Sequence, residues 1–100
     1  MHSLLLLEDA KQEWQDAAEY YEFKQKGLGE KFHKKVLEGL FTIVKEPKHN
    51  RKTRKEYREY LINRFPFLIV YRIDEVIKTI VIVSVFHTKR NPIHKYNREK

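Results

Sequence analysis

Two stretches of the chain carry apolar residues at the three- and four-residue spacing of a helix face. In the first stretch, acidic residues stand between the apolar positions Ala10, Trp14, Ala17, Ala18 and Tyr21. In the second, lysines lie off a stripe made of Phe32, Val36, Leu40, Ile43 and Val44. The spacing predicts two amphipathic helices. Gly27 and Gly29 separate them and Pro47 ends the second, so we expect an antiparallel helical hairpin.

The remaining apolar runs have the length and composition of strands. Residues 3–7 lack alternation, which predicts a short strand buried on both faces. Residues 57–62 and 77–86 also predict strands. In 65–73, one face is predicted to carry Phe65, Phe67, Ile69, Tyr71 and Ile73, and the other Leu68 and Val70. The order β-α-α-β-β-β predicts the α+β class, with the hairpin packed on an antiparallel sheet.

Length and composition limit the alternatives. A chain of 100 residues, 41% of them hydrophobic, predicts one domain over residues 1–100. Residues 91–100 are expected to form a short helix or a flexible tail that orders with a partner. The sequence has no cysteine, which excludes disulfides and thiolate metal sites. No apolar run is long enough to span a membrane, so we expect a soluble, cytoplasmic protein without a membrane partner.

Charge is distributed unevenly along the chain. The net charge is +7, yet residues 1–30 hold seven acidic and three basic residues. Residues 48–64 hold seven basic and two acidic residues, and residues 87–100 hold five basic and one acidic. Two basic stretches favour an anionic partner, which can be nucleic acid or an acidic protein. A merely solvated basic surface is the alternative.

Several segments, taken in this order, resemble the RelE/ParE superfamily of toxins from type II toxin–antitoxin modules, also called the plasmid stabilization protein family. They are AAEYYE (17–22), GLGEKF (27–32), EYREYLI (56–62), FPFLIVYRI (65–73) and VSVFHTKRNP (83–92), with Arg98 beyond them. The resemblance covers nearly the whole chain. It implies a small α+β sandwich in which a helical hairpin packs on a curved antiparallel sheet.

The resemblance also implies a partner and two kinds of action. The partner is a cognate antitoxin, whose acidic segment would suit the basic stretches. ParE-like members poison DNA gyrase, whereas RelE-like members cut mRNA on the ribosome. We expect the ParE-like action, with growth inhibition as its outcome; the RelE-like endoribonuclease is the alternative. A third possibility is an inactive basic module that remains in a repressor complex.

The candidate site residues follow from what RNA cleavage would need: an acid or base and cations for the phosphate. His87 and Arg90 are the candidate catalytic pair, only if the protein is a nuclease. Candidates for phosphate or target binding are Lys52, Arg54, Arg58, Arg64, Lys89 and Tyr96. The histidines lack metal-ligand spacing, so neither a metal nor another cofactor is expected.

One departure weakens the nuclease interpretation. RelE-like nucleases usually carry an Arg inside the strand that matches 65–73, where this chain has Leu68 or Ile69. Both catalytic candidates also have structural interpretations. His87 can end a strand and bond to the backbone, and Arg90 can pair with an acid of the first helix, such as Glu19 or Glu22.

Overall fold

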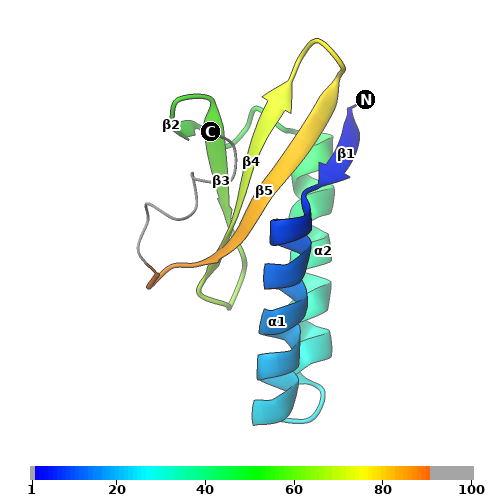
Figure 1. The fold of residues 1–100 in the computed structure, drawn as a ribbon, viewed down its shortest axis with the longest axis vertical. Coiled ribbons are helices and arrows are strands. Elements are labelled where there is room, and N and C mark those ends of the chain that lie inside the picture. Colours follow the sequence, from blue (N-terminus) through cyan, green and yellow to red (C-terminus); the bar gives the residue numbers. More distant parts are fainter. Residues whose placement is uncertain (1, 91–100) are drawn as a thin grey trace.

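The computed structural model describes residues 2–90 and contains two helices and five strands (Figure 1). In chain order they are β1 Ser3–Leu6, α1 Glu8–Lys24, α2 Leu28–Lys45, β2 Lys52–Arg54, β3 Tyr57–Leu61, β4 Phe67–Asp74 and β5 Thr79–His87. The helical hairpin packs on one face of the sheet and extends past the strands at its closed end. The predicted α+β class is confirmed. The expectations for residues 91–100 lie outside the described residues.

The sheet is mixed, whereas a wholly antiparallel sheet was expected. The strand order is β1-β5-β4-β3-β2, and β1 pairs with β5 in parallel, with Ser3 opposite Thr79. The other pairs are antiparallel. Strands β2 to β5 follow one another through short turns, which enforce antiparallel pairing. Strand β1 is separated from β5 by most of the chain, so the returning helical hairpin sets its direction.

Two details of the strand predictions are wrong. The run at residues 3–7 was expected to be buried on both faces, but Leu4 and Leu5 are 42% and 49% exposed. Strand β1 forms the edge of the sheet, so only Leu6 at its end and Leu7 just after it pack against the hydrophobic core. The basic run after Pro47 was not predicted as a strand, yet Lys52–Arg54 forms the opposite edge as β2.

The core occupies both faces of the sheet. Between helices and sheet lie Phe32, Val36, Leu40, Ile43, Ile69 and Tyr71, among others. A smaller cluster on the opposite face contains Tyr57, Val70, Val81, Val83 and Phe86. The predicted division of the central strand is confirmed, because Phe67, Ile69 and Tyr71 face the helices and Val70 faces away.

The turn between the helices depends on Glu22 and two glycines. The Glu22 carboxylate accepts hydrogen bonds from the backbone N–H groups of Gly27 (2.9 Å) and Gly29 (3.0 Å). Gly27 has φ of 87°, a left-handed conformation that glycine adopts without strain. A Cβ atom on Gly29 would lie 2.4 Å from the carbonyl oxygen of Ala18, so the helices could not approach as closely. This turn fixes where α1 and its aromatic residues stand against the sheet.

Candidate functional site

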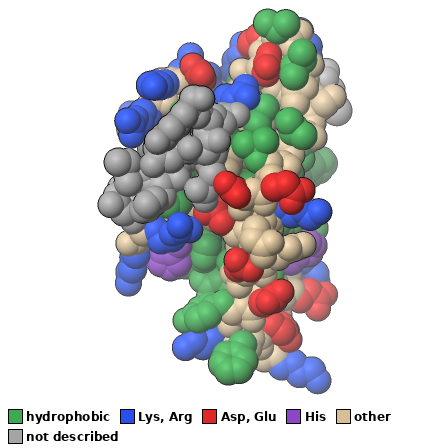
Figure 2. All heavy atoms as spheres, viewed as in Figure 1, with side chains coloured by type: hydrophobic (Ala, Val, Ile, Leu, Met, Phe, Trp, Pro, Cys, Tyr) green, Lys and Arg blue, Asp and Glu red, His purple; other side chains and the backbone are tan. Residues whose placement is uncertain are grey.

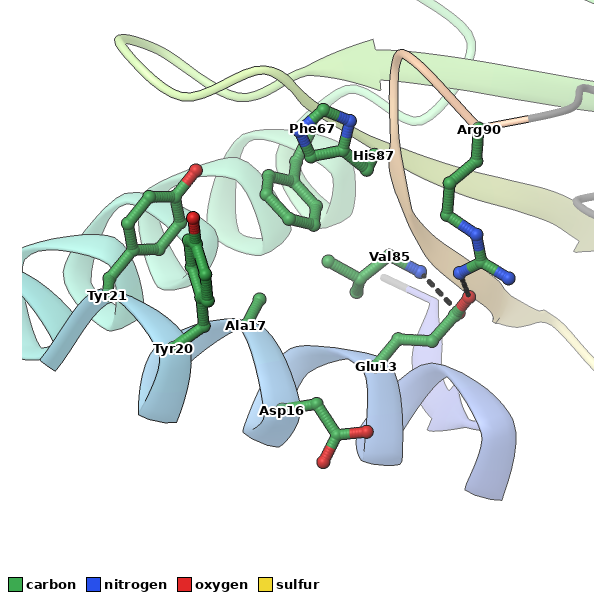
Figure 3. A pocket seen from close by; sticks show the side chains of 9 residues that line it. All are labelled: Glu13, Asp16, Ala17, Tyr20, Tyr21, Phe67, Val85, His87 and Arg90. Atoms are coloured by element: carbon green, nitrogen blue, oxygen red, sulfur yellow. Dashed lines mark hydrogen bonds and ion pairs between the residues drawn. The ribbon is translucent and has the colours of Figure 1, made fainter. Parts of the chain in front are cut away.

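The His–Thr–Lys–Arg stretch borders a hollow of about 410 Å³ where β5 leaves the sheet (Figure 3). Helix α1 lines it with Glu13, Asp16, Ala17, Tyr20 and Tyr21. The sheet and the chain after it line it with Phe67, Val85, His87 and Arg90. We call this hollow the strand-end pocket. Its floor is apolar, and its rim carries acids on the helix side and bases on the sheet side.

Glu13 connects both sides of the strand-end pocket. One carboxylate oxygen, Oε1, accepts hydrogen bonds from the Ser84 hydroxyl (2.8 Å) and the Val85 N–H (3.1 Å). The other, Oε2, lies 3.1 Å from Nη1 of Arg90. The Glu13 side chain is only 13% exposed, and Ser84 is fully buried. Because Ser84 interrupts an apolar strand, its hydroxyl needs a buried partner, which the carboxylate supplies.

Arg90 therefore pairs with an acid of the first helix, as its structural interpretation expected, but that acid is Glu13. Glu22 holds the interhelical turn instead. The Arg90 guanidinium also stands 5.3 Å from the centre of the Phe86 ring. Sequence analysis did not identify Glu13 and Ser84. A serine among apolar strand residues was the one signal that a polar partner comes from another element.

His87 ends β5 and bonds to the backbone of the turn that follows. Its Nδ1 accepts a hydrogen bond from the Lys89 N–H at 3.0 Å, and its carbonyl accepts one from the Arg90 N–H. Its ring packs against the edge of Phe67, with centroids 5.0 Å apart. Because Nδ1 accepts this bond, the ring N–H lies on Nε2.

The structure separates the other predicted cations from His87. Arg58 stands opposite Tyr71 and His87 opposite Phe67, so the two backbones are roughly 13 Å apart along the strand direction. The Arg58 guanidinium donates to the carbonyl oxygens of Lys48 and Asn50. Lys52 pairs with Arg58 at the far edge of the sheet. These cations do not converge on one phosphate beside His87.

Three further candidates are exposed, at separate places. Arg54 is at the end of β2, Arg64 in the turn between β3 and β4, and Lys89 just after β5. Tyr96 lies outside the described residues. The strand position where RelE-like nucleases carry an Arg is occupied by Leu68, which pairs with Phe86, or by the fully buried Ile69.

The part of the chain that the structure describes shows neither a metal-binding cluster nor a membrane-spanning helix. Across residues 2–90, no group of three or more His, Asp or Glu side chains is arranged to hold a metal ion. Over the same range, neither helix is long and apolar enough to cross a bilayer. Figure 2 shows acidic side chains following α1 down one face of the molecule, in agreement with the predicted acidic head.

Comparisons with known proteins identify the fold and the family. The structure described as the chromosomal ParDE toxin–antitoxin system from P. aeruginosa aligns with a TM-score of 0.72 and 20% identity, over 89% of this chain and 98% of that one. The isolated E. coli RelE toxin aligns with a TM-score of 0.67 and 17% identity, over 94% of this chain and 92% of that one. The structure of the intact E. coli RelBE toxin–antitoxin complex aligns with a TM-score of 0.70 and 16% identity, over 90% of this chain and 100% of that one.

At these identities the structural matches show the fold alone. Comparison with curated proteins gave no match. The family model described as the ParE toxin of type II toxin–antitoxin systems (parDE) matches residues 4–92, nearly the whole of the described chain. This protein therefore belongs to the ParE toxin family of type II toxin–antitoxin systems.

Proposed function

We propose that this toxin acts in the ParE-like manner: it inhibits growth by binding DNA gyrase and has no nuclease activity. The observation that carries the proposal is the engagement of both catalytic candidates in structural contacts. His87 bonds to the turn backbone, and Arg90 bonds to Glu13. A group that supports a phosphate in a transition state has to be available to it.

The arrangement around the strand-end pocket supports the same proposal. No cation from β4 reaches the pocket, because Leu68 and Ile69 occupy the relevant positions. Arg58 and Lys52 lie away from His87, in the β2–β3 hairpin. A binding surface for a protein target needs shape and charge, both of which the pocket and its rim supply, and it needs no acid–base pair.

An antitoxin partner belongs to the same proposal. Two of the similar structures are described as a toxin–antitoxin system and a toxin–antitoxin complex. The net charge of +7 would attract an acidic antitoxin segment and speed its association. We expect that binding to neutralise the toxin.

The decisive experiment compares the wild-type chain with His87→Asn after induction in a bacterial host. Asparagine can still accept the Lys89 N–H bond through its side-chain oxygen but cannot transfer a proton. We expect both chains to arrest growth, to inhibit supercoiling by purified gyrase, and to leave no new RNA 5′ ends. Purified His87→Asn should unfold at the same temperature as the wild type, which serves as the folding control.

The other outcomes lead to the alternatives. New 5′ ends inside coding regions that disappear with His87→Asn would establish the ribosome-dependent endoribonuclease and end the gyrase proposal. Wild-type induction without growth arrest would favour the inactive module in a repressor complex.

A further inference from the structure

A second hollow of about 630 Å³ lies between the start of α2 and the turn that joins β3 to β4. Lys31, Lys34 and Lys35 line it from the helix, and Arg64 lines it from the turn. Its apolar lining includes Tyr21 and Phe65. We call this hollow the basic crevice. It lies outside the His–Thr–Lys–Arg stretch and shares only Tyr21 with the lining of the strand-end pocket.

The cations of the basic crevice exceed its acids. Lys34 and Glu30 are 3.7 Å apart and Lys35 and Glu38 are 3.3 Å apart, both as neighbours on the helix surface. Within residues 2–90, neither Lys31 nor Arg64 has an ion-pair partner. Positive charge therefore faces the hollow from both walls. Such an arrangement attracts an anionic ligand that lies between them.

The apolar lining decides which anionic ligand fits. The Phe65 ring meets Tyr21 at 5.0 Å and Phe32 at 5.1 Å, both edge to face. Single-stranded nucleic acid binds where aromatic faces are free for bases to stack. Here the partly buried rings are already packed against one another, so they offer a patch for an apolar side chain. Lys31 and Lys34 lie about one helical turn apart, so each can meet a separate carboxylate on either side of an apolar side chain of the ligand.

We propose that the basic crevice binds an acidic protein segment that inserts an apolar side chain against Tyr21 and Phe65. Carboxylates before and after that side chain would meet Lys31 and Lys34 on the helix wall and Arg64 on the turn wall. The recognised pattern is thus acidic–apolar–acidic in an extended or helical segment. This surface gives the toxin a second protein contact, which shares Tyr21 with the strand-end pocket.

The chain offers a matched pair of variants for the test. Arg64 has φ of 71° and Lys78 has φ of 52°, so both are cations in left-handed turn positions. Glycine is favoured in that conformation, so Arg64→Gly and Lys78→Gly each remove one positive charge without straining the backbone. Lys78 precedes β5 at the other end of the β4–β5 hairpin and does not line the basic crevice.

The measurement is fluorescence anisotropy of labelled decapeptides on the purified full chain. One peptide alternates Glu and Leu, a second alternates Glu and Ser, and a six-nucleotide oligothymidine has as many backbone charges as each peptide has glutamates. We expect the Glu–Leu peptide to bind most tightly. Arg64→Gly and Lys31→Ala should each weaken it about fivefold or more, and Lys78→Gly less than about twofold. Higher salt should weaken binding in every case.

Equal effects of Arg64→Gly and Lys78→Gly would mean attraction by net charge alone and would overturn the proposal. Tighter binding of the oligothymidine through Arg64 and Lys31 would also overturn it and would assign the crevice to nucleic acid. Equal binding of the Glu–Ser and Glu–Leu peptides would refute the apolar anchor. None of these results depends on toxicity, so they stand apart from the test of the gyrase proposal.

Discussion

At the scale of single residues, Glu13 and Tyr71 satisfy buried polar groups that come from distant parts of the chain. Glu13 accepts bonds from Ser84, Val85 and Arg90. Tyr71 donates to the Pro47 carbonyl at 2.7 Å and accepts from the Asn50 amide at 3.2 Å. If the polar atoms of Glu13 or Tyr71 are removed, the groups that bond to them lose a hydrogen bond at a partly buried position.

Replacing Glu13 by alanine should lower the free energy of unfolding by about 2 kcal/mol, because the buried Ser84 hydroxyl and the Val85 N–H lose their acceptor. The Arg90 contact contributes little of this, since its side chain is 48% exposed. Urea denaturation measures the change. Glu19→Ala, at an exposed position of the same helix, should stay within about 0.5 kcal/mol. Equal values for the two variants would contradict the role given to Glu13.

Replacing Tyr71 by phenylalanine should cost about 1 kcal/mol, because the Pro47 carbonyl loses its donor while the ring stays packed. Burial raises the pKa of Tyr71 above its ordinary 10.0. The folded state therefore keeps its proton where the unfolded state loses it. Stability from this group is complete below pH 10.0 and is lost as pH rises above it. Chemical denaturation between pH 9 and 11 should show a fall in the free energy of unfolding that is smaller in Tyr71→Phe. An equal fall in both proteins would argue against a raised Tyr71 pKa.

At the scale of elements, the helical hairpin packs closely on the sheet, and glycine permits that distance. A Cβ atom on Gly39 would lie 2.7 Å from a ring carbon of Tyr60 and 2.9 Å from Cδ1 of Ile69. The periodicity of 28–45 predicted the helix and its apolar stripe. By position Gly39 falls on that stripe, three residues after Val36 and four before Ile43, but the spacing could not show how closely β3 and β4 approach it.

Gly39→Ala should therefore destabilise the protein by about 1–3 kcal/mol through overpacking, although alanine is the better helix former by nearly 1 kcal/mol. Thermal unfolding followed by circular dichroism measures the change. Lys34→Ala, on the exposed side of α2, is the control and should leave the midpoint almost unchanged. A rise in the midpoint for Gly39→Ala would mean that helix propensity outweighs the contact with β3 and β4.

At the scale of the whole molecule, Glu75 connects three segments that are remote in sequence. Its carboxylate lies 2.9 Å from Nζ of Lys48 and 3.4 Å from Nε2 of His2. The turn between β4 and β5 is thereby joined to the loop after α2 and to the start of β1. These contacts are exposed, so they hold the end of the sheet in place more than they stabilise the fold.

Bonds from Lys48 and then His2 hold the pKa of Glu75 below its ordinary 4.5. A lowered pKa means that the folded state releases its proton at a lower pH than the unfolded state does. The contribution is present above pH 4.5 and disappears as pH falls below it. An NMR titration of the Glu75 carboxyl carbon should give a midpoint that Lys48→Ala raises. A midpoint that Lys48→Ala leaves unchanged would show that the ion pair does not form in solution.

Apolar spacing alone predicted both helices, every strand except β2, and the two faces of the central strand, because it reflects which side of a helix or strand is buried. The sequence also carried the family resemblance. It could not determine that β1 pairs in parallel with β5, since pairing between strands so far apart depends on where the helices return the chain.

The environments of the candidate residues within 2–90 could be known only from the folded chain. The sequence grouped His87 and Arg90 with Lys52, Arg54 and Arg58 because all are basic. In the fold, β4 separates β5 from the β2–β3 hairpin. The Arg90 guanidinium donates instead to Glu13, a residue 77 positions away. The physical reason is that charge is a property of a residue, whereas a bond to that charge depends on which distant side chain folding brings within reach.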